Sequence, residues 1–297
     1  MAVATQELTK PRRVEGGQER RTAFDVFMQV VAYIVLVAVA LAMFVPFIFS
    51  LTTSLKSVPE SNLPLSLRGL FWPETITTAA YQTVFDADIG RWFFNSAFVA
   101  TIWVLGRAFT ASAAGYAFAR MDFPGKNLVF LLVLSTIMIP GMVTIVPKFI
   151  ILRELRLIDS YGALTLPFLA DAFAIFLMKQ FFESIPGELE EAARVDGASR
   201  YRMFWQIIMP LSMPALTALA IFSFQGSWNA FLEPLIFINN PDLFTLPLGL
   251  AFFKQTYLTE WPTLMAIAVI TTVPIAIFYV IFQRWFVEGQ SRAGIKG

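Results

Sequence analysis

The sequence contains neither cysteine nor histidine among its 297 residues. These two absences exclude zinc sites built on those ligands, thiolate nucleophiles, disulfides and serine–histidine–aspartate triads. The chain also lacks a phosphate-binding loop of the pattern G-x-x-x-x-G-K-S/T, because Arg120 stands where the first glycine before Gly125 would be needed. We therefore expect a chain that is not an enzyme, holds no cofactor or metal of its own and does not hydrolyse ATP.

Charge is scarce as well. Only 14% of the residues are charged whereas 57% are hydrophobic, and a soluble domain has about 25% charged residues. The chain therefore lacks the polar surface that a water-soluble body needs, and we expect it to reside in a lipid bilayer. The net charge of +1 provides no basic face that would bind nucleic acid.

Six apolar stretches are each long enough to cross the hydrocarbon core of a bilayer as a helix, which takes about 20 residues. They cover residues 26–49, 92–118, 128–150, 161–182, 211–238 and 263–286. The first exceeds the roughly 7–15 apolar residues of a cleavable signal, so we expect it to remain as an anchor. The sequence thus predicts an all-α membrane protein with six transmembrane helices, which divides into a tail at 1–23, a transmembrane domain at 24–286 and a second tail at 287–297.

The orientation follows from lysine and arginine, which favour the cytoplasmic side of short loops. With six spans and a cytoplasmic N-terminus, 14 of these residues lie on the cytoplasmic side and 7 on the other, so both termini are predicted to be cytoplasmic. The first outer loop, 51–91, is rich in prolines and aromatic residues and is predicted to form a folded cap. Two interpretations of this cap stay open, a plain structured loop and a surface that contacts a partner.

The cytoplasmic segment Ile185–Pro210 is predicted to form a helix, a glycine elbow and a second helix. Gly197 ends the first helix because glycine takes the left-handed conformation at little cost, and Ser199 can cap the second. The first helix carries carboxylates near its positive end and small residues that let another protein approach closely: Glu188, Glu190, Glu191, Ala192 and Ala193. The second helix carries an apolar stripe: Tyr201, Phe204, Trp205 and Ile208. From the residues alone, this segment could equally be a surface helix resting on lipid.

Several blocks of residues resemble a known family. Glu191, Ala192 and Ala193, followed by Gly197 and by 207–210, resemble the EAA signature of ATP-binding-cassette (ABC) importer permeases, with Met209 where the pattern has leucine. Further blocks resemble sugar-importer permeases of the six-span maltose type. They are Ala117–Lys126, Trp228–Leu235, Thr245–Leu250, Gln283–Gly289 and Gly294–Gly297.

The resemblance implies a type I ABC importer permease fold in a bacterial-type inner membrane. It further implies a second permease subunit, an external substrate-binding protein, and two ATPase subunits that bind ATP and Mg. By resemblance, the EAA segment is the coupling helix that docks on an ATPase, and the tail also contacts the ATPases. The implied coupling residues are Glu190, Glu191, Ala192, Ala193, Asp196 and Gly197, and those of the tail are Gly294, Lys296 and Gly297. The implied substrate is a carbohydrate; an oligosaccharide, a monosaccharide and a glycerol phosphate all stay possible.

A translocation path would require polar residues inside the spans, where they are costly in lipid. Asp171, Gln225, Trp228 and Asn229 are the candidates. The alternatives are pairing of Asp171 with another ionisable residue such as Arg107, and helix packing for the 225–229 stretch. Pro140 and Pro274 are expected to kink the third and sixth spans. A secondary transporter or channel without an ATPase is the alternative function, and it would not need a cytoplasmic docking helix.

Overall fold

The computed structural model describes residues 23–64, 67–256 and 260–293, and within these residues the regular structure is helical throughout. The chain divides into two compact units, residues 1–48 and 49–297. The tail predicted at 1–23 lies almost wholly outside the described residues. Helix α1 (Ala23–Ser54) is the first span; it is apolar on all sides, and its most apolar window has no residue buried within the chain. Such a helix suits a lipid environment.

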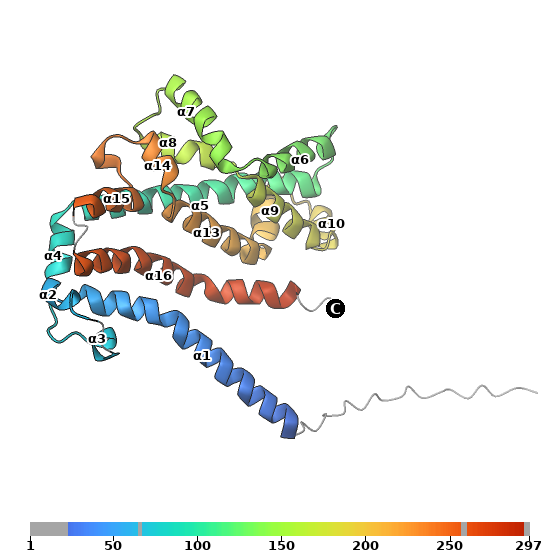
Figure 1. Cartoon of the computed structure of the whole chain (residues 1–297). Coiled ribbons are helices and arrows are strands. Elements are labelled where there is room, and N and C mark those ends of the chain that lie inside the picture. The colour runs from blue at the N-terminus through green and yellow to red at the C-terminus, as the bar shows by residue number, and fades with distance from the viewer. Residues whose placement is uncertain (1–22, 65–66, 257–259, 294–297) are drawn as a thin grey trace, which may run out of the picture. The chain divides into compact units, whose positions relative to one another are not determined.

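The second unit is built around α5 (Ile89–Arg120), which packs against α9 (Ala172–Ser184) and α13 (Met213–Trp228). Helix α13 in turn packs against α16 (Trp261–Ala293), as Figure 1 shows. Gly115 permits the close approach of α5 and α9, because a Cβ atom there would lie 2.9 Å from the backbone nitrogen of Lys179.

The other three predicted spans are bent. The third consists of α6 (Lys126–Ser135), the short turns η1 (Thr136–Met138) and η2 (Gly141–Thr144), and α7 (Ile145–Glu154). Its two halves meet at 99° beside Pro140, where the kink was predicted. The fourth, α8 (Tyr161–Thr165) and η3 (Leu166–Phe168) followed by α9, bends by 41°, and α13 meets the helix before it at 74°. The described residues thus contain three helices long and apolar enough to cross a membrane, or up to six such segments when each bent pair counts as one.

Two boundaries differ from the sequence prediction. The fifth span was predicted to reach residue 238, but α13 ends at Trp228, and a short α14 (Leu232–Phe237) follows after a break. Apolar content cannot distinguish a continuous helix from two helices separated by a turn. The C-terminal tail was predicted from 287, but α16 continues to Ala293 and runs through Pro274 as one helix. The tail residues Gly294, Lys296 and Gly297 lie outside the described residues.

The predicted cap after α1 is folded. It contains three short helices: α2 (Val58–Ser61), α3 (Leu67–Phe71) and α4 (Ala79–Asp86). Thr52 Oγ1 donates a hydrogen bond to the Leu70 carbonyl at 2.9 Å, and α4 packs against α16. The cap comes directly before α5 in the sequence. It lies at the end of α5 that begins with Ile89, and Arg120 is at the other end.

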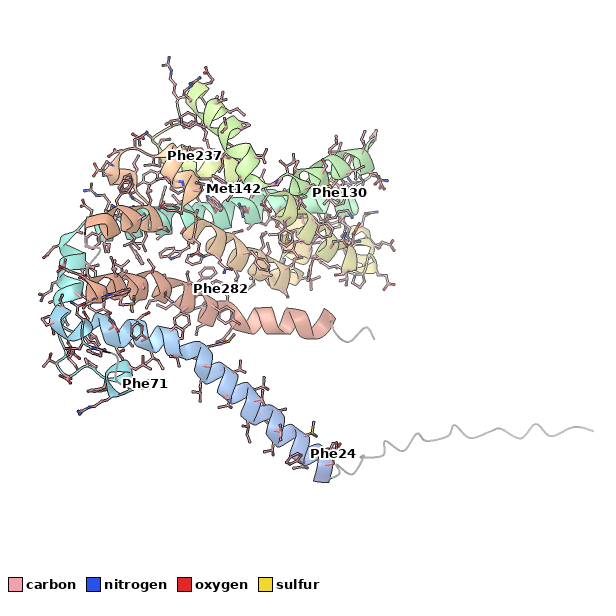
Figure 2. The ribbon with its side chains drawn as sticks, in the orientation of Figure 1. Phe24, Phe71, Phe130, Met142, Phe237 and Phe282 are labelled. Carbon is pink, nitrogen blue, oxygen red and sulfur yellow. The ribbon has the colours of Figure 1, made fainter. Side chains whose placement is uncertain are left out.

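Buried side chains form two clusters, one towards each end of α5. The first contains Trp92, Trp103, Phe237 and Trp228, and it also involves η5 (Pro241–Leu243) and α15 (Leu246–Thr256), which pack against α5. The second contains Tyr116, Met178, Phe182 and Ile208. Figure 2 shows labelled side chains from both regions, Phe237 in the first and Phe130 beside the second. The second cluster carries the segment that the sequence singled out.

Candidate coupling site

The segment that follows α9 forms the predicted helix, elbow and second helix. Helix α10 (Glu188–Val195) ends before Gly197, which has φ of +79°. This is the left-handed conformation in which glycine carries no Cβ penalty. Helix α11 (Arg200–Met203) is capped by Ser199, whose hydroxyl accepts a hydrogen bond from the Arg202 amide at 3.3 Å. The chain continues through a π-helical turn, η4 (Phe204–Ile208), and α12 (Met209–Leu211) into α13.

Helix α10 has two different faces. Glu190 and Ala193, three residues apart, are 7% and 9% exposed and point into the chain. The rest of the helix surface carries three exposed apolar residues, Leu189, Ala192 and Val195 (88% exposed), among the exposed charged residues Glu188, Glu191 and Arg194. We define these three apolar residues as the outer face of α10.

The inner face of α10 is fixed by a buried ion pair. Arg120 Nε, at the end of α5, lies 3.0 Å from Glu190 Oε1, and these side chains are 17% and 9% exposed. The Tyr116 hydroxyl lies 3.3 Å from Glu190 Oε2 and donates to it. Arg120 also donates to the carbonyls of Phe182 (2.7 Å) and Ile185 at the end of α9. One guanidinium thus connects the ends of α5 and α9 to α10.

This geometry changes the expected roles of two residues. Glu190 and Ala193 were expected on the docking surface, and the structure places both on the buried inner face of α10. Glu191, Ala192, Asp196 and Gly197 are exposed. Carboxylates at 188, 190 and 191 surround the helix, so the sequence alone could not show which one turns inward. The available signal was Arg120, a charge that comes directly after a predicted span.

The second helix is partly buried. Ile208 is fully buried, and the centre of the Phe204 ring lies 5.1 Å from that of the Tyr116 ring. These two residues of the predicted stripe therefore pack on the second cluster. Tyr201 and Trp205 remain exposed, at 75% and 40%.

Arg107 and Asp171 pair inside the transmembrane unit. Arg107 Nη2 lies 3.8 Å from Asp171 Oδ2, and Arg107 Nε donates to the Phe168 carbonyl at 2.7 Å. Asp171 Oδ1 accepts from the Ala174 amide at 2.8 Å and so caps α9. The guanidinium also lies 4.4 Å from the centre of the Trp103 ring. The pairing alternative for Asp171 is therefore what the structure shows, and the pair holds the bend between η3 and α9.

The polar stretch at the end of α13 divides between two environments. Trp228 is buried, its ring stacks on Phe224 at 5.3 Å, and its Nε1 donates to the Thr271 carbonyl of α16 at 3.1 Å. Gln225 and Asn229 are exposed, and Asn229 Nδ2 donates to the Gln225 carbonyl at 3.0 Å. Trp228 therefore acts in helix packing, whereas the side chains of Gln225 and Asn229 are exposed.

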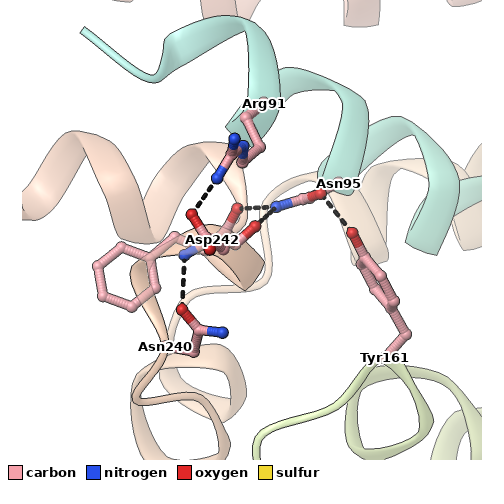
Figure 3. A network of polar contacts seen from close by, with 6 residues as sticks. Arg91, Asn95, Tyr161, Asn240 and Asp242 are labelled. Atoms are coloured by element: carbon pink, nitrogen blue, oxygen red, sulfur yellow. Dashed lines mark hydrogen bonds and ion pairs between the residues drawn. The ribbon is translucent and has the colours of Figure 1, made fainter.

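A third polar network, shown in Figure 3, was not expected from the sequence. Asn95 Nδ2 donates to the carbonyls of Asp242 and Phe244, both at 2.9 Å, and Asn95 Oδ1 accepts from the Tyr161 hydroxyl at 2.6 Å. Arg91 pairs with the Asp242 carboxylate. The network ties the η5 segment to α5 and α8 at the end of the unit away from α10. An asparagine within an apolar span was the one available signal.

These features define a class before any comparison with other proteins: a helical membrane protein with bent spans and an exposed, rigidly held helix at one end. A chain in the crystal structure of a bacterial ABC transporter involved in the import of the acidic polysaccharide alginate has the same fold. The TM-score is 0.76 at 24% identity, with 89% of this chain and 98% of that chain covered. The type I ABC importer permease fold is therefore confirmed.

The particular family follows from the sequence comparisons. Residues 109–292 match the family of binding-protein-dependent transport system inner membrane components, and the chain belongs to this family. It is 39% identical over 230 residues to the arabinooligosaccharides transport system permease protein AraQ of Halalkalibacterium halodurans, covering 77% of this chain and 82% of the relative. It is 33% identical over 276 residues to the sn-glycerol-3-phosphate transport system permease protein UgpE of Yersinia enterocolitica, covering 91% and 97%.

Proposed function

We propose that the chain is one of two permease subunits of an ATP-driven carbohydrate importer. In this proposal an external binding protein delivers the solute, and two ATPase subunits, which hold ATP and Mg, drive the transport cycle. Membership of a family of binding-protein-dependent transport components supports the assembly. The substrates named for the relatives, arabinooligosaccharides and sn-glycerol 3-phosphate, support a hydroxyl-rich solute.

The observation that carries the proposal is the asymmetry of α10. Its outer face, Leu189, Ala192 and Val195, is exposed together with the neighbouring carboxylates Glu188 and Glu191, whereas its inner face is anchored by Glu190 to Arg120. A helix that is only resting on lipid would not need a buried ion pair to fix its orientation. A docking helix does need one, because the movement of its partner must be passed on without loss.

The mechanism follows from these contacts. We infer that the outer face of α10 docks on an ATPase, with Glu191, Asp196 and Gly197 at its edge. When the ATPase moves, α10 moves as a rigid element, and the Arg120–Glu190 pair passes the displacement to the ends of α5 and α9. Since α5 packs along both α9 and α13, this displacement changes the packing of the spans and alternates access between the two sides of the membrane.

The solute path is proposed to include Gln225 and Asn229, the exposed amides at the end of α13. Trp228, between these two amides in the sequence, is held in place by stacking on Phe224. Asp171 pairs with Arg107 and so holds the bend between η3 and α9. The tail residues Gly294, Lys296 and Gly297 are proposed to contact the ATPases. Both termini are proposed to be cytoplasmic, on the side of α10, in agreement with the distribution of lysine and arginine.

Uptake by proteoliposomes that contain the complex tests the function. The proposal expects uptake of a saccharide only when ATP is present on the side of α10 and the binding protein on the other side. The alternative, a secondary transporter or channel, expects uptake driven by an ion or solute gradient without the ATPases. Gradient-driven uptake by the two permease subunits alone would contradict the proposal.

A further inference from the structure

An open cavity of about 750 Å³ lies beside the cap, separate from the coupling site. Its walls come from the end of α1, from α2 and α3, and from Trp261 at the start of α16. The cap precedes the first residue of α5, Ile89, whereas α10 contacts the last, Arg120. A helix of 32 residues is about 48 Å long, so the cavity lies at the end of the spans away from α10.

The walls of this cavity are already organised by hydrogen bonds within the cap. Lys56 Nζ donates to the Gly69 carbonyl at 2.6 Å, and Glu60 Oε1 accepts from the Glu74 amide at 2.8 Å. The Thr77 amide donates to the Leu55 carbonyl at 2.9 Å. A site whose walls are fixed in advance loses little conformational entropy when a ligand binds.

Three polar groups in the wall have hydrogen-bonding capacity to spare. Thr53 is 3% exposed and Lys56 is 6% exposed, and both line the cavity. Thr53 Oγ1 and the second carboxylate oxygen of Glu60, Oε2, are buried and have no hydrogen-bond partner among the described residues. An ammonium group has three N–H donors, of which the Gly69 carbonyl takes one. Buried polar groups are normally satisfied, so this arrangement is suited to a ligand that completes the bonds.

The chemistry of the wall selects the ligand. The carboxylate of Glu60 repels an anion that the ammonium of Lys56 attracts, and the reverse holds for a cation, so the two charges together give no net preference for a charged ligand. A neutral hydroxyl group satisfies both, because it donates to the carboxylate and accepts from the ammonium. Trp261, 52% exposed at the rim, offers a flat apolar surface for the C–H face of a sugar ring.

We propose that this cavity is a binding site for a neutral saccharide, held by Lys56, Glu60 and Thr53 and covered by Trp261. Its volume lies within the roughly 300–1,000 Å³ of small-molecule sites. The site would hold the sugar outside the spans, apart from Gln225 and Asn229. The statement that the bound sugar is also the transported solute rests on the proposed carbohydrate import. The statement that the cavity binds a sugar does not rest on it.

The absence of cysteine from the chain permits a direct test by labelling. Asn62 is exposed and lines the cavity, so Asn62→Cys places a single thiol in the site. Gln82→Cys places a matched thiol on the exposed surface of α4, outside the cavity. The complex is reconstituted in lipid nanodiscs, which avoids sugar-based detergents, without ATP and without the binding protein. The alkylation rate by N-ethylmaleimide is then measured with arabinotriose, maltotriose, raffinose or glycerol 3-phosphate.

We expect at least one of the three neutral saccharides to slow alkylation of Asn62→Cys in a saturable manner and to leave Gln82→Cys unaffected. Adding Glu60→Gln or Lys56→Met should raise the protecting concentration roughly tenfold or more, since each removes a charged hydrogen-bond partner. The proposal is overturned if none of the three saccharides protects, if protection survives both substitutions, or if only glycerol 3-phosphate protects. Because the assay uses no ATP, its failure is distinct from failure of ATP-driven uptake.

Discussion

Replacing Glu190 with glutamine tests whether α10 is rigidly attached. The change keeps the shape of the side chain but removes the counter-charge of Arg120, whose side chain is 17% exposed. Breaking a buried pair in this way costs about 3–5 kcal/mol. The carbonyls of Phe182 and Ile185 still accept from Arg120, so we expect the lower end, about 3 kcal/mol. Arg120→Met also leaves these two carbonyls without their donor, so we expect the upper end, about 5 kcal/mol.

The measurement is a double-mutant cycle. The free energy of unfolding of Glu190→Gln, Arg120→Met and the double variant is determined by SDS titration in mixed micelles. We expect the double variant to lose less than the sum of the single losses, with a coupling energy of about 1–3 kcal/mol. Glu191→Gln is the matched control, because Glu191 is the exposed neighbour of Glu190; its effect should be within about 0.5 kcal/mol.

One result would refute the reasoning. If Glu190→Gln is as mild as Glu191→Gln and the double variant is additive, the ion pair does not hold α10. The transmission of movement from α10 to α5 would then need another route.

Three further predictions concern the elbow, the topology and the tail. Gly197→Val should lower uptake because a β-branched residue at φ of +79° costs roughly 1–2 kcal/mol. Gly197→Asn should retain most uptake because asparagine tolerates this conformation. Equal uptake by both variants would show that the elbow is not needed. In the cysteine-free chain, the thiols of Thr5→Cys and Ile295→Cys should react only with a reagent added on the α10 side of the membrane, and the thiol of Thr75→Cys only with one added on the opposite side. Termini on opposite sides of the membrane would contradict the six spans. Deletion of Ser291–Gly297 should leave the assembly intact on gel filtration but lower substrate-stimulated ATP hydrolysis; unchanged stimulation would mean that the tail has no part in coupling.

The sequence predicts much of the fold because apolar length is a local property. The second span, 92–118, is reproduced by α5 within a few residues, and the kink at Pro140 follows from the missing amide of proline. The end of α13 at Trp228 could not be predicted in the same way. Residues 229–238 are almost as apolar as the helix before them, and the break depends on how α13 and α14 pack against α16 and α8.

The candidate site shows the same division. The left-handed Gly197 could be predicted, because only glycine adopts that conformation without cost. The inward orientation of Glu190 could not, because it depends on Arg120, which lies far away in the sequence. Trp228 was a reasonable candidate for sugar contact, yet its environment is set by Phe224 and Thr271 on two different helices. Local chemistry therefore names the residues of a site, whereas tertiary packing decides which way each one faces.

The central claim, that the outer face of α10 docks on an ATPase, is tested most directly by Ala192→Trp. Ala192 is exposed on that face, whereas Ala193 is buried, so a large residue at 193 would clash within the chain whatever α10 does. Asn127→Trp, an exposed position at the start of α6, is the matched control. ATP-driven uptake is measured in proteoliposomes with equal amounts of permease. We predict that Ala192→Trp abolishes uptake, with ATPases lost from the complex or hydrolysis no longer stimulated by substrate, while Asn127→Trp remains active. Normal uptake by Ala192→Trp would contradict the docking assignment.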